Sequence, residues 1–151
     1  MKLAKARQLG LMDWFLLTEA WVQLFLTHCT LSLLPASRWM PKLVRRPTTN
    51  KSMRLPLECK SEQRLITAVN IAARYHILPM TCLRRAMTLQ AILARRGSFA
   101  TLRMGVRKSK TEISAHAWLE LGSRVINDDP DVHLQFSPLD IDALAPIGKT
   151  Q

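Results

Sequence analysis

The sequence contains few cysteines, and no two of them have the C-x-x-C spacing of a metal or redox motif. Its three cysteines, Cys29, Cys59 and Cys82, are odd in number and far apart in the 151-residue chain. A framework of disulfides is therefore not expected, and this usage fits a reducing cytoplasm. The four histidines show no zinc-ligand spacing, and His28 beside Cys29 supplies too few ligands. We expect no metal and no cofactor.

Acidic residues are also scarce relative to basic ones. The chain has 22 Lys and Arg against 11 Asp and Glu, which gives a formal net charge of +11 and a pI of about 10.5. Such a field attracts nucleic acids, anionic membranes or acidic peptides without choosing among them. The sequence lacks a helix-turn-helix pattern, RNA-binding aromatic motifs and zinc-finger spacing, so we expect no nucleic-acid partner. A non-catalytic basic binding module is kept as an alternative.

The N-terminal part is rich in apolar residues but lacks an uninterrupted run of membrane-spanning length. Residues 11–26 include Asp13 and Glu19, which would be costly inside a bilayer. No clear small-residue cleavage site follows, so a secretory signal fits poorly. We expect residues 1–34 to be mostly helical and to pack within the domain. Two alternatives are a docking face for a partner and peripheral contact with a membrane surface, helped by the basic residues at the start of the chain.

Four prolines interrupt the next stretch, residues 35–60, which also carries several basic residues. Prolines and a Thr-Thr-Asn run favour a loop or an extended linker. We therefore divide the chain into an N-terminal helical segment with its linker, residues 1–60, and a core domain, residues 61–151. The length suffices for one compact domain with a modest core.

Two adjacent helices are expected at the start of the core domain. Residues 61–77 and residues 82–96 each repeat apolar side chains at helical spacing. Thr81 is a suitable N-cap for the second helix, and Gly97 suits its C-terminal end. Cys82 therefore falls in the first turn, where the positive end of the helix dipole favours a thiolate over a thiol.

Two segments with alternating polarity follow the second helix. Residues 98–108 and residues 114–121 alternate apolar and polar side chains, which predicts two half-buried strands. In the second strand His116 shares its face with Trp118 and Glu120. A histidine on this face can meet the end of a helix that packs there. A further strand is expected near residues 133–137, and a helical turn near residues 141–144.

The acid that could serve His116 depends on the register of the turn that follows its strand. A two-residue turn at 122–123 places Asp129 across from His116, whereas a three-residue turn at 122–124 puts Asp128 on the face of His116. The residues alone leave Asp128 and Asp129 open.

Cysteine, histidine and aspartate in this order are typical of a papain-like or transglutaminase-like thiol enzyme. The thiolate would attack a carbonyl, the imidazole would carry the proton to the leaving amine, and the carboxylate would orient the imidazole. The backbone N–H of Cys82 is one donor for the oxyanion, whereas Gln90 lies too far along the helix. His76 is a rival base, although a histidine at a helix end is usually a favourable C-terminal charge.

Several segments in this part of the chain are together similar to one protein family. They are C-L-R-R-A from Cys82, L-x-x-x-L-A-R-R-G from Leu89, L-R-M-G-V from Leu102, A-H-A-W-L-E-L-G from Ala115 and V-I-N-D from Val125. In combination they resemble the lasso peptide biosynthesis B proteins, specifically their protease half, which is a member of the transglutaminase-like superfamily. The similarity covers about residues 61–139 and is weaker toward the N-terminus.

The resemblance implies an α+β fold with a papain- or transglutaminase-like core. In it, a helix bearing the cysteine packs on a small antiparallel sheet, and an N-terminal helical segment precedes them. The implied activity is a cysteine peptidase that removes the leader of a lasso peptide precursor. Its triad would be Cys82, His116 and Asp128, because the spacing in the family favours Asp128 over Asp129.

The resemblance also implies partners. A separate leader-recognition protein would deliver the precursor peptide, since no such domain is evident before residue 61. A separate cyclase resembling asparagine synthetase would then close the macrolactam, and it is a further candidate partner. We expect a cytoplasmic protein. Another transglutaminase-like acyl transfer or amidase activity is an alternative, because the same triad serves it.

Overall fold

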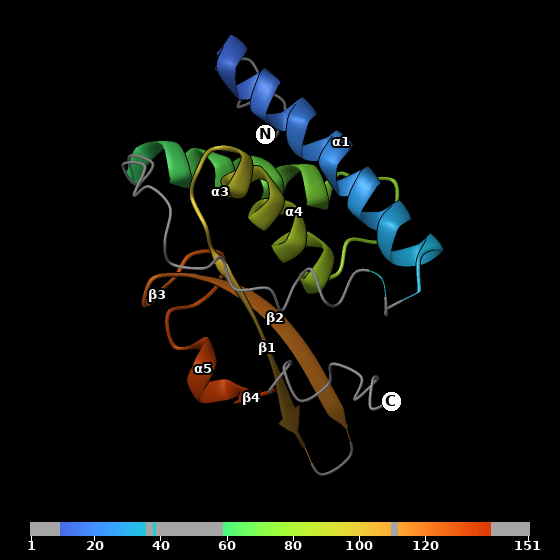
Figure 1. Ribbon diagram of the computed structural model, residues 1–151, viewed down its shortest axis with the longest axis vertical. Helices are drawn as coiled ribbons and strands as arrows, with labels where there is room; N and C mark the ends of the chain where they lie inside the picture. The colour runs from blue at the N-terminus through green and yellow to red at the C-terminus, as the bar shows by residue number, and fades with distance from the viewer. Residues whose placement is uncertain (1–9, 36–37, 39–58, 110–111, 140–151) are drawn as a thin grey trace, which may run out of the picture.

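The computed structural model describes residues 10–35, 38, 59–109 and 112–139, and its architecture is α+β as expected. The elements in chain order are α1 (Leu11–Leu33), α3 (Cys59–Arg74), α4 (Cys82–Arg95), β1 (Thr101–Lys108), β2 (Ile113–Leu121), β3 (Arg124–Val125), α5 (Val132–Gln135) and β4 (Ser137–Pro138). The three long helices pack against one another, and the small sheet lies on the other side of α4 from α1 (Figure 1).

The helices begin and end where local chemistry favours it. The Thr81 hydroxyl accepts a hydrogen bond from the Arg84 N–H at 3.4 Å, as an N-cap does, so α4 starts at Cys82 as expected. Gly97 follows α4 with a φ of 80°, a conformation that glycine adopts without steric cost. Helix α3 spans Cys59–Arg74 and thus starts two residues before, and ends three before, the predicted range.

The sheet has the strand order β3-β2-β1-β4 and is antiparallel at every pairing. Strands β1 and β2 pair over their full common length, from Thr101 opposite Glu120 to Lys108 opposite Ile113. The outer strands are short, with two paired residues each. The long β1–β2 hairpin is therefore the rigid part of the sheet.

The expectation of a strand near residues 133–137 is wrong for the first part of that range. A short helix, α5, occupies Val132–Gln135, and β4 is limited to Ser137–Pro138. The carboxylate of Asp129 accepts a hydrogen bond from the Asp131 N–H at 2.9 Å. This Asx turn bends the chain and starts the helix in place of an extended strand.

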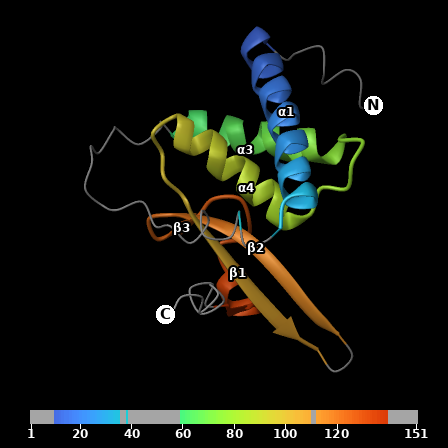
Figure 2. The same ribbon diagram turned by 45° about the vertical axis from the view of Figure 1, so that its right-hand side comes forward.

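One hydrophobic core joins the helices to the sheet. Leu89 and Leu93 of α4 lie in it, beneath α1 and α3 and above Ala117 and Leu119 of β2. Figure 2 shows α1 crossing α3 and α4 on the side away from the sheet. Only one side of α1 enters this core, through Ala20, Leu24 and Thr27, so the expectation that the N-terminal helix is buried holds for that side alone.

Several expectations lie outside the described residues: most of the linker at residues 35–60, the first nine residues of the predicted N-terminal helix and the helical turn near residues 141–144. Within the described part of the chain, no helix has both the length and the apolarity needed to cross a membrane.

Candidate active site

His116 and Asp128 are joined by a short hydrogen bond. The distance from His116 Nε2 to Asp128 Oδ2 is 2.5 Å, and each side chain is 26% exposed. Because a carboxylate only accepts, Nε2 carries the hydrogen in this pair and Nδ1 is the ring nitrogen left for a second partner. The other carboxylate oxygen, Asp128 Oδ1, accepts from the Asp129 N–H at 2.8 Å. The pair is therefore held in one orientation and is still reachable from solvent.

The route by which Asp128 reaches His116 differs from the expected one. The β2–β3 turn has two residues, since Leu121 pairs with Arg124. In a continued ladder this register would have set Asp129 opposite His116. The ladder ends early because the Asn127 side-chain oxygen accepts from the Leu119 N–H at 2.7 Å, in place of a backbone carbonyl. The chain then leaves the sheet, and Asp128 turns toward His116.

An ion pair between an exposed arginine and a buried glutamate anchors the other end of the same turn. The Arg124 guanidinium donates to Glu62 Oε1 at 2.7 Å, and Glu62 lies buried in α3. Removing Arg124 would leave the buried Glu62 carboxylate without a compensating charge. The contact ties β3 to the helix layer and so limits movement of the segment that carries Asp128.

Two aromatic side chains stack on the His116 ring. The ring stacks on Phe136 at a centroid distance of 4.9 Å and on Trp118 at 6.4 Å. Gly105 lies opposite His116 in the β1–β2 register. A Cβ atom at Gly105 would approach Phe136 Cβ to 2.8 Å and Ser137 O to 3.0 Å. Glycine is thus required for Phe136 to reach the imidazole.

Trp118 is fixed in turn by polar contacts. Its indole Nε1 donates to Glu120 Oε1 at 3.1 Å, and Arg103 Nε donates to Glu120 Oε2 at 2.9 Å. The predicted grouping of His116, Trp118 and Glu120 on one face is confirmed by these contacts. Neither Phe136 nor Asn127 was identified from sequence. The one signal in the sequence is Gly105, opposite His116, because a glycine inside a strand can mark a close approach of another part of the chain.

Cys82 is a half-buried free thiol in the first turn of α4, packed against the core. Helix α4 packs directly on β2. Ala117 and Leu119, on the face of β2 alternate to His116, are buried in the core with α4. Among the described residues the Cys82 thiol forms no hydrogen bond. The structure thus brings His116 and Asp128 together and does not join Cys82 to them by a hydrogen bond.

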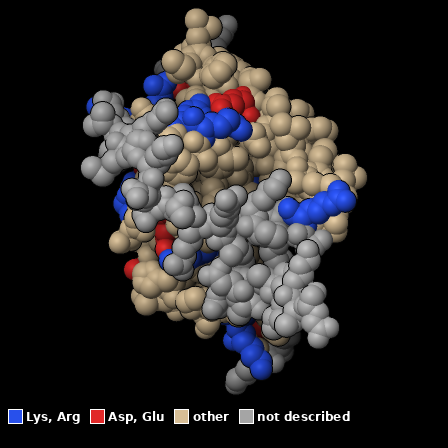
Figure 3. Space-filling model, viewed as in Figure 1, with Lys and Arg blue, Asp and Glu red and all other residues tan. Residues whose placement is uncertain are grey.

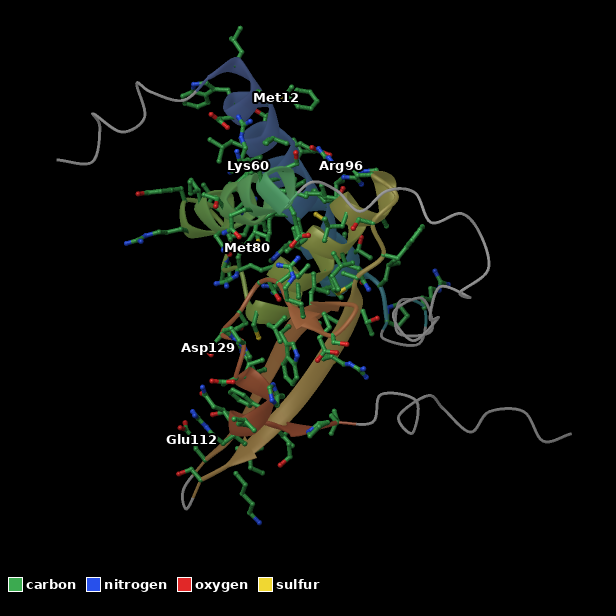
Figure 4. All side chains as sticks on the ribbon, turned by 90° about the vertical axis from the view of Figure 1, so that its left-hand side faces the viewer. Met12, Lys60, Met80, Arg96, Glu112 and Asp129 are labelled. Atoms are coloured by element: carbon green, nitrogen blue, oxygen red, sulfur yellow. The ribbon has the colours of Figure 1, made fainter. Side chains whose placement is uncertain are left out.

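The chain flanking these residues can be followed in Figure 4. Met80 precedes Cys82 by two residues and Asp129 follows Asp128, and both labelled residues lie on the same flank of the molecule in that view, near where the helices meet the sheet.

The two other candidates from sequence have different contacts. His76 Nδ1 accepts from the Leu78 N–H at 3.1 Å, and its ring stacks on Trp21 at 4.6 Å. These contacts direct His76 toward α1. The Gln90 side chain donates to the Ala100 carbonyl at 2.9 Å, so its amide is occupied in tying α4 to the start of the sheet.

Comparison with known proteins gives the class. The family profile of the transglutaminase-like superfamily matches residues 25–140, and the chain belongs to this superfamily. The matched range contains α3, α4 and the whole described sheet. Searches of curated proteins and of solved structures gave no match.

In the described ranges, no three metal-ligating side chains come together.

Proposed function

We propose that this chain is a cysteine peptidase that removes the leader from a lasso peptide precursor. The observation that carries the proposal is the His116–Asp128 hydrogen bond on β2, the strand whose other face packs on the helix that begins with Cys82. Superfamily membership supports thiol chemistry, because the superfamily includes cysteine peptidases and acyltransferases. The resemblance of residues 61–139 to the lasso peptide B proteins supports the particular substrate.

In this mechanism the Cys82 thiolate attacks the carbonyl carbon of the scissile bond. His116 delivers a proton from Nδ1 to the leaving amine, while Asp128 holds the imidazole through Nε2. The first-turn N–H groups of α4 lack intrahelical acceptors, so the Cys82 N–H is available to the oxyanion. Water then hydrolyses the acyl-enzyme and releases the leader with a free carboxylate.

Catalysis requires Cys82 Sγ to come within hydrogen-bonding distance of His116 Nδ1. Such contacts are often long in the absence of substrate and tighten in the complex. We propose that the bound precursor brings the α4 N-terminus and β2 into this contact, and that a separate leader-recognition protein presents the precursor. The lasso cyclase would then act on the freed amine.

Processing of a precursor tests the reaction. The chain is incubated with its candidate precursor and the leader-recognition protein, and the products are identified by mass spectrometry. Two fragments, leader and core, are expected for wild type and for Cys29→Ala, and intact precursor for Cys82→Ala. Cleavage by Cys82→Ala at the wild-type rate would contradict the assignment. A product of unchanged length with an altered side chain would instead indicate an amidase or acyl transferase.

Thiol reactivity tests the Cys82–His116 contact with the leader peptide and the leader-recognition protein bound, the state in which we propose that the contact forms. Iodoacetamide alkylates thiolates, so site-resolved mass spectrometry compares Cys82 with Cys29 in the same sample. Cys82 should react faster than Cys29 near pH 6, and His116→Ala should remove this difference while leaving Cys29 unchanged. Equal rates for Cys82 in both proteins would argue against a thiolate–imidazolium pair.

A further inference from the structure

Helix α1 is turned so that its acids face the protein. Asp13 Oδ1 accepts from Arg64 of α3 at 2.6 Å, and Glu19 Oε2 accepts from Arg96 at 2.6 Å. Arg64 holds the pKa of Asp13 below its ordinary value, and hydrogen bonding to Arg96 does the same for the pKa of Glu19. Together these pairs fix which side of α1 faces inward.

The opposite side of α1 is apolar and exposed. In its first four to five turns the exposed side chains are Leu11, Met12, Trp14, Phe15, Thr18, Trp21, Val22, Phe25 and Leu26. None of them is charged, and Thr18 is the one polar member. Exposure runs from 38% at Trp21 to 92% at Leu11. The surface over α1 is accordingly almost uncharged in Figure 3.

We call this set of side chains the outer face of α1. An amphipathic helix of a water-exposed domain normally shows the reverse arrangement, with apolar side chains inward and charges outward. Contiguous apolar surface of this kind marks a site of contact with another protein or with a membrane. The stacked rings of Trp21 and Phe25, with centroids 6.4 Å apart, add a rigid aromatic element to it.

Cations border the outer face. Arg64 on the α3 side and Arg95 on the α4 side are each about half exposed, at 53% and 50%. Lys60 is exposed and, with Arg64, lines a largely apolar groove between α1 and α3. The nine residues that precede α1's N-cap contain three basic side chains and no acid. Asp13 and Glu19 compensate part of this charge, so the surroundings keep a net positive charge, whereas the face itself is neutral.

We propose that the outer face of α1 docks on an anionic lipid bilayer, with the helix lying in the plane of the surface. An apolar face with tryptophans and phenylalanines sits at the boundary between headgroups and acyl chains, and neighbouring Lys and Arg attract anionic headgroups. The combination of a neutral face with a positive border favours this occupant over a second copy of the chain, whose own border would be positive too. Docking of α1 is independent of the peptidase chemistry, so its test needs no precursor.

Flotation with lipid vesicles tests the docking. The full chain is mixed with phosphatidylcholine vesicles that contain or lack phosphatidylglycerol, and the bound fraction is measured. Phe15→Glu and Phe25→Glu place a charge in the outer face. Ile113→Glu is the matched control, because Ile113 is 71% exposed and lies on β2, at the far end of the sheet from α1 (Figure 1). Thermal unfolding verifies that each variant folds.

The expected result is binding to the anionic vesicles that falls about tenfold in each α1 variant and stays unchanged in Ile113→Glu. High salt should weaken the binding, because headgroup attraction is screened. Equal binding to neutral vesicles would overturn the electrostatic basis. Absence of vesicle binding would overturn the proposal altogether. If sedimentation velocity also showed a dimer that Phe15→Glu dissociates, the outer face would be an interface between copies of this chain.

Discussion

Helices α1 and α4 pack on the same core but expose opposite kinds of side chain. In α4 the buried apolar positions are Ala86, Leu89, Ile92 and Leu93, and Arg95 is half exposed. In α1 the acids turn inward to meet arginines, and aromatic side chains face outward. Burial of apolar side chains therefore determines which face of α4 points inward. For α1 the inward face is determined by ion pairs and a small number of buried side chains. Hydrophobic periodicity in the sequence predicts which face of α4 is buried, but it does not predict which face of α1 is buried.

The largest expected difference is in the rate of precursor cleavage. It separates variants of two neighbouring acids, Asp128 and Asp129, in the region of α4 and β2. Asp128→Ala should lower the rate of precursor cleavage by about 100-fold to 10,000-fold, because the imidazole loses its orienting carboxylate. Asp129→Ala should have a small effect, since Asp129 makes no hydrogen bond to His116. Initial rates measured by mass spectrometry compare them, and the reverse order would assign the role to Asp129.

The contrast between the two helices predicts unequal effects of the same truncation. Leu89→Ala should lower the free energy of unfolding by about 2–5 kcal/mol, because Leu89 is 1% exposed and lies in the core shared by the helices and the sheet. Leu26→Ala should change it by about 0.5 kcal/mol or less, since Leu26 is 50% exposed on the outer face. Urea unfolding followed by circular dichroism measures both. Similar losses would mean that the outer face is covered in the folded chain.

A smaller effect is expected where the backbone approaches His116. Gly105→Ala should cost about 1–3 kcal/mol of stability, because the new methyl group meets Phe136 and the Ser137 carbonyl. Cleavage should also fall as Phe136 moves from the imidazole. Gly10→Ala is the matched control, since its Cβ would have no neighbour closer than 3.9 Å. Wild-type stability in Gly105→Ala would show that β4 can shift without loss.

The smallest predicted effect concerns pH. Because the folded pKa of Glu19 is below its ordinary value of 4.5, its stabilising contribution is present above pH 4.5 and disappears as the pH falls through the folded pKa. Glu19→Gln should therefore lose about 0.5–1 kcal/mol at neutral pH, because solvent screens the partly exposed ion pairs, and should show a weaker decline in acid than wild type. Thermal unfolding between pH 3 and pH 7, values chosen around the ordinary carboxyl range, compares them. Parallel curves would show that the ion pair does not orient α1.

Sequence reasoning reached the elements that rely on local chemistry. Thr81, the apolar repeat of α4 and the alternation around His116 placed one helix and two strands within a few residues. The match to the transglutaminase-like superfamily bears out the fold class that these elements suggested.

What sequence reasoning missed depends on contacts between distant parts of the chain. Asn127 replaces a backbone acceptor at Leu119, and no local rule anticipates that a side chain will end a ladder. The Asx turn at Asp129 similarly replaced an expected strand by α5. The orientation of α1 follows from arginines more than forty residues away, so the pattern of its own residues predicted only that something must cover it.

The Asn127 side chain makes the identity of the acid at His116 depend on a single amide. If that oxygen is removed, as in Asn127→Ala, the Leu119 N–H is free to take a main-chain acceptor and the β2–β3 hairpin can lengthen. A longer hairpin exchanges one carboxylate for its neighbour at the imidazole. Two consecutive aspartates would thus place a carboxylate at the imidazole whether the hairpin ends at Asn127 or continues past it.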